Sequence, residues 1–271
     1  MLSIVVSILH SWGYRVRVLQ EENYLPSIIL FRVLVFMDLI AASTSPESDP
    51  RDRKHFFFHA TPLRKVIVAI LRAVFLFVMD MRVEGLDNFP SDGPVIVACN
   101  HVTNFDVFPM QLALPRPIFY MGKMELFQNP VTDVLFRNMG AFPVNREKKD
   151  PWAYNHALKV LRHRQTLGMF PEGTRSKGRG LGVARTGVAR MSIETDTLIV
   201  PMAIAGSDKF FKRFPRRARV TVRLLPSILP RPGETPLALT DRLMFTLAAA
   251  LPSEMRGVYA EMPEGFEESY P

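Results

Sequence analysis

The sequence contains one cysteine, Cys99, among its 271 residues. A single thiol cannot form a disulfide within the chain, and it cannot supply the paired cysteines of a structural zinc site. The fold is therefore not held by disulfides, which fits a reducing compartment. We also expect no secretory signal, because the apolar residues 1–9 lack a basic leading segment and a small-residue cleavage site.

Long apolar runs are scarce as well. A membrane-spanning helix needs about 20 mostly apolar residues, and one charge at its centre costs about 2.5–3.5 kcal/mol on insertion scales. The segment 28–42 is interrupted by Arg32 and Asp38, and the segment 66–79 by Arg72. We expect the first segment to contact the membrane at its interface, with charged side chains reaching the headgroups. The second fits an interfacial helix and an ordinary packed helix equally well.

Acidic residues are fewer than basic residues. The chain has 34 Lys and Arg residues against 26 Asp and Glu residues, a formal net charge of +8. A basic surface favours nucleic acid, an anionic membrane or phosphorylated small molecules, and composition alone does not choose among them. Hydrophobic residues make up 48% of the chain, which is enough for a folded core.

The sequence divides into four parts. Residues 1–60 combine apolar segments, for which membrane association is one interpretation, with a polar linker, and we expect residues 61–80 to form an amphipathic or membrane-contacting helix. Residues 81–255 are the main domain, and residues 256–271 are an acidic tail. In the main domain short apolar runs alternate with helical spacing, which predicts an α/β fold with a mixed sheet and helices on both faces.

The apolar runs and the helical spacing also predict where the strands and helices begin and end. We expect strands at 81–85, 95–99, 116–120, 142–144, 167–170, 198–204 and 219–225. We expect helices after residues 104 and 122, and at 151–164, 184–194 and 240–251.

A histidine and an aspartate follow the apolar run 95–99. His101 precedes Asp106 by five residues, a spacing that does not share one face of a regular helix. At a strand-to-helix turn the two side chains could meet, and the carboxylate would accept a ring N–H and raise the basicity of the other nitrogen. His101 would then be a candidate general base, an effect typically worth about 10²- to 10⁴-fold in rate. The alternative is a helix capped by Asn104 or Asp106 with His101 as a bystander, and the spacing alone favours it.

Cations follow the ends of three other predicted strands. Residues 170–176 read Phe-Pro-Glu-Gly-Thr-Arg-Ser, a turn whose small residues let backbone N–H groups approach an anion while Arg175 binds phosphate. The alternative is a surface turn in which Glu172 pairs with Arg175. Lys123 and Arg146 also lie beside strand ends, where α/β folds bind ligands, although a solvated surface position is the usual one for a single cation.

The apolar run 199–205 contains Pro201 and is most simply a core strand, with the lining of an acyl channel as the second interpretation. We expect no metal site. His101 and Asp106 are two potential ligands, and nothing nearby supplies the third and fourth that zinc requires.

These blocks, in this order, resemble the glycerolipid acyltransferases of the 1-acyl-sn-glycerol-3-phosphate (lysophosphatidic acid) acyltransferase type. The resemblance covers about residues 82–207. The His-x4-Asp motif of the family matches His101 and Asp106, and its Phe-Pro-Glu-Gly-Thr-Arg motif matches residues 170–175 in full. The remaining blocks match residues 122–126, 142–146 and 200–201.

The resemblance implies a glycerolipid acyltransferase-like fold and an O-acyltransferase of phospholipid biosynthesis. Such an enzyme moves a fatty acyl group from acyl-CoA or acyl carrier protein to the free hydroxyl of lysophosphatidic acid or a related lysophospholipid. It implies His101 as the base, Asp106 as its orienting partner, no covalent acyl-enzyme and no bound cofactor. The acceptor's phosphate would be bound by Arg146, Glu172, Gly173, Thr174 and Arg175, with Lys123 as a further candidate.

The resemblance also implies a membrane-associated protein, peripheral or monotopic, at the cytoplasmic face. Residues 209–219 interleave cations with aromatic side chains. With the acyltransferase blocks present, we rank contact with an anionic membrane above nucleic acid for this stretch, and we expect no nucleic-acid partner. A solvated basic loop is the commonest state of such a stretch.

Some features depart from the family pattern or fit other functions. Residues 1–61 and those after 205 lie outside the motifs, and residues 102–105 differ from the Ser or Gln that many members carry, which leaves the acceptor open. Three rival functions follow: an enzyme with Cys99 as nucleophile, a membrane-surface binding protein with an inactive domain, and an acyl-thioester hydrolase. Buried packing is the simpler interpretation of Cys99.

Overall fold

The computed structural model describes residues 49–210, 216–264 and 266. The apolar segments expected before residue 49 and the centre of the basic stretch, 211–215, lie outside these ranges. The chain divides into two compact units, Met1–Lys54 and His55–Pro271. In the first unit the described residues form a short 3-10 helix, η1 (Pro50–Arg53), which is capped by the side chain of Asp49.

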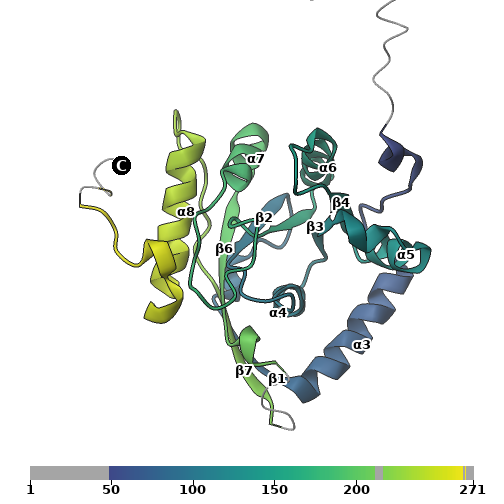
Figure 1. Ribbon diagram of the computed structural model, residues 1–271, viewed down its shortest axis with the longest axis horizontal. Helices are drawn as coiled ribbons and strands as arrows, with labels where there is room; N and C mark the ends of the chain where they lie inside the picture. Colours follow the sequence, from purple (N-terminus) through teal and green to yellow (C-terminus); the bar gives the residue numbers. More distant parts are fainter. Residues whose placement is uncertain (1–48, 211–215, 265, 267–271) are drawn as a thin grey trace, which may run out of the picture. The chain divides into compact units, whose positions relative to one another are not determined.

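The second unit is built on a seven-stranded sheet with the order β1-β7-β6-β2-β5-β3-β4 (Figure 1). The pair β6–β7 is antiparallel, whereas the other five pairings are parallel, so the predicted mixed sheet is confirmed. The strands are β1 (Met79–Glu84), β2 (Val95–Cys99), β3 (Ile118–Lys123), β4 (Ala141–Val144), β5 (Thr166–Met169), β6 (Ile199–Ala205) and β7 (Ala218–Leu224).

Helices cover both faces of this sheet, as predicted. Figure 1 shows α6, α7 and α8 on one side and α3 and α4 on the other, in agreement with two separate apolar clusters. The helices are α3 (Pro62–Val78), α4 (Val107–Ala113), α5 (Pro130–Asn138), α6 (Pro151–Arg162), α7 (Gly187–Thr195) and α8 (Pro236–Ala250). None of the helices in the described ranges is long and apolar enough to cross a membrane.

Local sequence explains where four of these helices begin. Thr61, Asn129, Asp150 and Thr235 each accept a backbone N–H through the side chain at the first turn of a helix, and each is followed by proline. Such a cap satisfies a free donor, and proline at the first helical position has no N–H to lose. The cap at Thr235 is why α8 begins at Pro236 and not at the predicted residue 240.

The central strand β2 shows why its sequence is a continuous apolar run. Ile96 and Ala98 face the cluster formed with α6, α7 and α8, whereas Val97 and Cys99 face the cluster formed with α3 and α4. Side chains alternate along a strand, so a strand buried on both faces has no polar positions.

The strand predicted at residues 116–120 is β3, which begins two residues later and continues to Lys123 because it pairs with β4. The helical segment expected after residue 122 consists of a 3-10 helix, η3 (Met124–Phe127), followed by α5. Gly122 allows this arrangement, because a Cβ there would lie 2.9 Å from the ring of Phe127.

Candidate active site

The turn between β2 and α4 brings His101 and Asp106 together. Asp106 is the residue before α4, but its carboxylate makes no cap hydrogen bond to that helix. It turns back instead, and Oδ2 lies 2.9 Å from Nδ1 of His101. The contact predicted between these side chains is present, and the alternative in which Asp106 caps the helix through its side chain is not observed.

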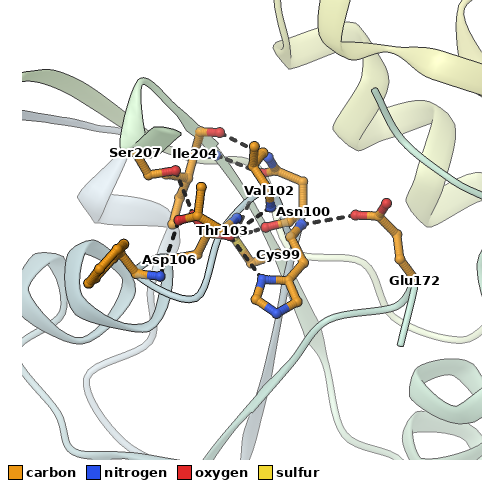
Figure 2. A network of polar contacts seen from close by, with 10 residues as sticks. Cys99, Asn100, Val102, Thr103, Asp106, Glu172, Ile204 and Ser207 are labelled. Carbon is orange, nitrogen blue, oxygen red and sulfur yellow. Dashed lines mark hydrogen bonds and ion pairs between the residues drawn. The ribbon is translucent and has the colours of Figure 1, made fainter. Parts of the chain in front are cut away.

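Five donors converge on this buried carboxylate, whose residue is only 1% exposed (Figure 2). Oδ2 also accepts the backbone N–H groups of Val102 and Thr103, at 2.7 and 2.8 Å. Oδ1 accepts the hydroxyls of Thr103 and Ser207, at 3.3 and 2.5 Å. An ionised carboxylate can only accept hydrogen bonds, so all five groups act as donors to it.

An ionised Asp106 determines the tautomer of His101. A carboxylate can only accept, so Nδ1 of the neutral ring carries the proton and Nε2 has the free lone pair. The ring stacks on Phe170 with centroids 3.9 Å apart. Within the described residues no protein group hydrogen-bonds Nε2, so this nitrogen can take a proton from a bound molecule.

The end of β6 holds this turn from the other side. Asn100 donates to the carbonyl of Ile204 at 2.9 Å and accepts its N–H at 2.8 Å (Figure 2). Ser207 follows the same strand and donates to Asp106. Asn100 and Ser207 were not predicted as site residues, because their partners lie about a hundred positions away in the chain.

Glu172 links the second predicted block to the histidine. Its Oε1 accepts the backbone N–H of His101 at 2.9 Å (Figure 2), and its Oε2 accepts the backbone N–H of Gly182 at the same distance. Burial raises the pKa of Glu172, while these two N–H donors act in the opposite direction. The surface turn in which Glu172 pairs with Arg175 is therefore not the observed arrangement.

The neighbouring residues of this block have distinct positions. Gly173 adopts a φ of +68°, and its N–H donates to the carbonyl of Phe170 at 3.0 Å, so it is engaged within the turn. Thr174 and Arg175 are exposed. The backbone N–H of Ser176 donates to the carbonyl of His101 at 2.7 Å. Arg175 therefore lies in a segment that is hydrogen-bonded to the backbone of the histidine.

Three arginines gather beside this segment. Partial burial lowers the pKa of Arg146, and the nearby Arg175 and Arg185 lower it further, while Glu125 opposes them. In the described ranges none of the three arginines forms an ion pair with a carboxylate. Lys123 does, because its ammonium lies 2.6 Å from Glu125. Arg185 was not among the residues singled out from the sequence, where it has the appearance of an ordinary surface cation.

Two other predicted residues lie in the core. Pro201 is buried in β6 opposite Ala98 of β2, and its role in an acyl channel stays a prediction. Cys99 is fully buried, and burial first, then Asp106 and Glu172, raises the pKa of its thiol well above the usual value. A thiolate nucleophile is disfavoured there. Among the described residues no three His, Cys, Asp or Glu side chains are grouped to hold a metal ion.

Comparison with known proteins adds to this geometry. Residues 80–205 match the model of the family described as Acyltransferase. A 1-acyl-sn-glycerol-3-phosphate acyltransferase of Borreliella burgdorferi is 30% identical over 131 residues, which are 48% of this chain and 52% of that one. The enzyme of the same name from Bacillus subtilis is 36% identical over 97 residues, 35% of this chain and 49% of that one. The matched segments thus span about half the length of these relatives.

A solved structure resembles most of the chain. The crystal structure of the 1-acyl-sn-glycerophosphate (LPA) acyltransferase PlsC from Thermotoga maritima has a TM-score of 0.58 and 18% sequence identity, covering 92% of this chain and 96% of that one. At this identity the likeness concerns the fold.

Proposed function

We propose that this protein transfers a fatty acyl group from a thioester to the free hydroxyl of a lysophospholipid, and the match of residues 80–205 to the family model described as Acyltransferase supports this proposal. The acceptor is lysophosphatidic acid or a related lysophospholipid, and the donor is acyl-CoA or acyl carrier protein. The observation that carries the proposal is the His101–Asp106 pair, at 2.9 Å, in a turn bonded to the segment that bears Arg175.

The geometry of His101 suits a general base. Nε2 takes the proton of the acceptor hydroxyl as its oxygen attacks the thioester carbonyl carbon, and Asp106 stabilises the imidazolium that forms. The tetrahedral intermediate then collapses with cleavage of the C–S bond, and the imidazolium returns the proton to the leaving thiolate. The histidine ends neutral, and no acyl group is attached to the protein.

The three arginines suit the phosphate of the acceptor. A phosphate monoester carries a charge of about −1.5 to −2 at neutral pH and binds the planar guanidinium through paired hydrogen bonds. Arg146, Arg175 and Arg185 form no ion pair with a carboxylate of the described residues, so their charges are available to the phosphate. Thr174, with its hydroxyl, directly precedes Arg175 in the chain. Glu172, by contrast, is buried and fully engaged by two N–H groups, so we assign it the positioning of His101 instead of contact with the phosphate.

Helix α3 suits contact with an anionic membrane. Val66, Ile70, Val74 and Phe77 are spaced along one face and are 48–77% exposed. An exposed apolar stripe of this kind on an amphipathic helix favours a position in the plane of the membrane interface. Replacing Ile70 by glutamate should reduce co-sedimentation with anionic vesicles, while the same change at Leu237, equally exposed on α8, should not. Equal losses of vesicle binding at both positions would refute a specific role of α3 in membrane contact.

The first experiment is acyl transfer by the purified protein in detergent. Labelled acyl-CoA or acyl carrier protein is supplied with and without lysophosphatidic acid, for the protein and for His101→Ala. Label in phosphatidic acid that disappears in the variant supports the reaction and the base together. Label that moves only to another lysolipid changes the acceptor. Thioester loss without a lipid product indicates hydrolysis, and no consumption of any donor would overturn the proposal in favour of a binding protein.

The phosphate site is tested by Arg185→Ala. Loss of one charged hydrogen-bonding partner should raise the KM for lysophosphatidic acid about 10-fold to 100-fold. The matched control is Arg219→Ala, an exposed arginine on β7, which should leave this KM unchanged. An unchanged KM in Arg185→Ala would exclude this arginine from phosphate binding.

A further inference from the structure

The loop between β5 and α7, residues 170–186, carries Arg175 and Arg185 and contains no helix or strand of its own. Loops of this length inside a compact domain are uncommon and are usually functional. Glycines at positions 173, 178, 180 and 182 make this one costly to hold in one conformation, because glycine loses the most freedom on ordering. Contacts from outside the loop must therefore fix it.

The C-terminal segment supplies such contacts. It consists of two 3-10 helices, η5 (Ser253–Met255) and η6 (Gly257–Tyr259), and lies beyond the part of the chain that matches the family model. Leu181 uses both of its backbone groups here: its N–H donates to the carbonyl of Met255 and its carbonyl accepts the N–H of Val258, each at 3.0 Å. The hydroxyl of Tyr259 accepts the N–H of Ala184 at 3.2 Å.

Two glycines allow the segment to approach this closely. Gly257 adopts a φ of +55°, and a Cβ at this position would overlap the carbonyl oxygen of Leu181. A Cβ at Gly180 would lie 2.6 Å from the backbone nitrogen of Gly257. The two backbones therefore meet with no side chain between them, and any larger residue at Gly257 must push the loop away.

The contacts continue from Leu181 to the histidine. The next residue, Gly182, donates its N–H to Glu172, and the other oxygen of Glu172 accepts the N–H of His101. We propose that residues 253–259 form a clamp that positions the loop 170–186 and, through Glu172, the backbone of His101. Gly257 and Tyr259 are the positioning residues of this clamp. The consequence for catalysis rests on the proposed function, whereas the consequence for loop order does not.

Hydrogen exchange of the full-length protein in detergent tests the clamp without reference to activity. Gly257→Ala should accelerate exchange in peptides covering 172–186 and 101–103 by about threefold to tenfold, the factor that corresponds to one lost hydrogen bond. The matched control is Gly233→Ala, which imposes a similar backbone cost at a φ of +76° with nothing within 4 Å of the new Cβ. Unchanged exchange in Gly257→Ala, or equal changes in both variants, would overturn the proposal.

If Gly257→Ala does not fold, the kinetics of a second pair of variants, Tyr259→Phe and its control Tyr154→Phe, test the proposal. Tyr259→Phe removes only the acceptor of the Ala184 N–H, and Tyr154→Phe removes a hydroxyl bonded at 2.7 Å to Glu194 elsewhere in the domain. Tyr259→Phe should raise the KM for lysophosphatidic acid about threefold, leave the KM for the donor unchanged and accelerate loop exchange. Tyr154→Phe should do none of these, and identical behaviour of the two would refute the clamp. Faster loop exchange in a protein that transfers no acyl group would refute the proposed function alone.

Discussion

Replacing Asp106 by asparagine should separate the charge of this carboxylate from its hydrogen bonds. Oδ2 accepts three N–H groups, those of the His101 ring, Val102 and Thr103, whereas Oδ1 meets only the hydroxyls of Thr103 and Ser207. A hydroxyl can accept as well as donate. An asparagine with its oxygen at the Oδ2 position and its NH₂ at the Oδ1 position can therefore keep all five contacts and the tautomer of His101.

What this variant loses is the negative charge that stabilises the imidazolium. Two unit charges about 4 Å apart interact by about 4 kcal/mol at an effective dielectric constant of about 20. We therefore expect kcat/KM to fall by up to about 10³-fold. The folded state should lose little, because the cost of burying the charge is removed together with its interactions.

Asp106→Ala should behave differently because it removes the acceptor of Val102 and Thr103. Each buried N–H left without a partner costs about 1–3 kcal/mol, and a domain of this size loses about 2–4 °C of Tm per kcal/mol. Thermal unfolding in detergent and acyl-transfer kinetics on both variants distinguish the two cases. Equal destabilisation by asparagine and alanine would refute the inferred hydrogen-bond pattern. Turnover by Asp106→Asn within about threefold of the unsubstituted protein would refute the role of the charge.

Three further predictions follow from single contacts. Ser207→Ala removes a hydroxyl donor of Asp106 and should lower kcat about 10-fold, whereas Ser192→Ala, which removes an equally buried hydroxyl bonded to a backbone carbonyl, should lower Tm and leave kcat unchanged. Burial is the largest single influence on the pKa of Glu234 and raises it, but the hydrogen bonds from Arg242 and from the Arg231 backbone, together with the charges of both arginines, outweigh burial and hold the folded pKa below 4.5. The stability gained is present above pH 4.5 and is lost as the pH falls through the folded pKa. Glu234→Gln should accordingly lower Tm at about pH 7, and in unfolding scans this difference should shrink as the pH falls through the folded pKa. Cys99→Ala should retain kcat, and loss of turnover in a folded variant would revive the acyl-cysteine mechanism.

The helices and strands were predictable from the sequence, but the order of the strands was not. Strands such as β2 and β6 are buried on both faces, so their apolar runs are visible without any knowledge of their neighbours. The pairing of β1 with β7, which joins Met79 to Ala218, brings together two ends of the domain. The spacing of apolar residues indicates which faces of a strand are buried, but it does not indicate which strand pairs with it.

The site was predictable where the contacting residues lie close together in the sequence. His101 and Asp106 lie within one turn, and the strand before them and the helix after them leave little choice of geometry. Glu172 and Ser207 reach the same turn from 71 and 101 positions away, and Glu172 does so through a backbone N–H of His101. A contact to a backbone group leaves no mark on the identity of the partner residue, so no motif could have indicated it.

The glycine of the Glu-Gly-Thr-Arg block shows how folded contacts change the meaning of a motif. From the sequence, Gly173 is expected to let its N–H approach an anion, but that N–H is already bonded to the carbonyl of Phe170. Arg185 folds back onto the same turn through its own N–H, which donates to the carbonyl of Pro171 at 2.9 Å. A Cβ at Gly173 would lie 3.2 Å from Cδ of Arg185, tighter than an ordinary contact. Within the proposed phosphate site Gly173 therefore makes room for an arginine, whose guanidinium can bind the anion, and its own N–H stays bonded within the turn.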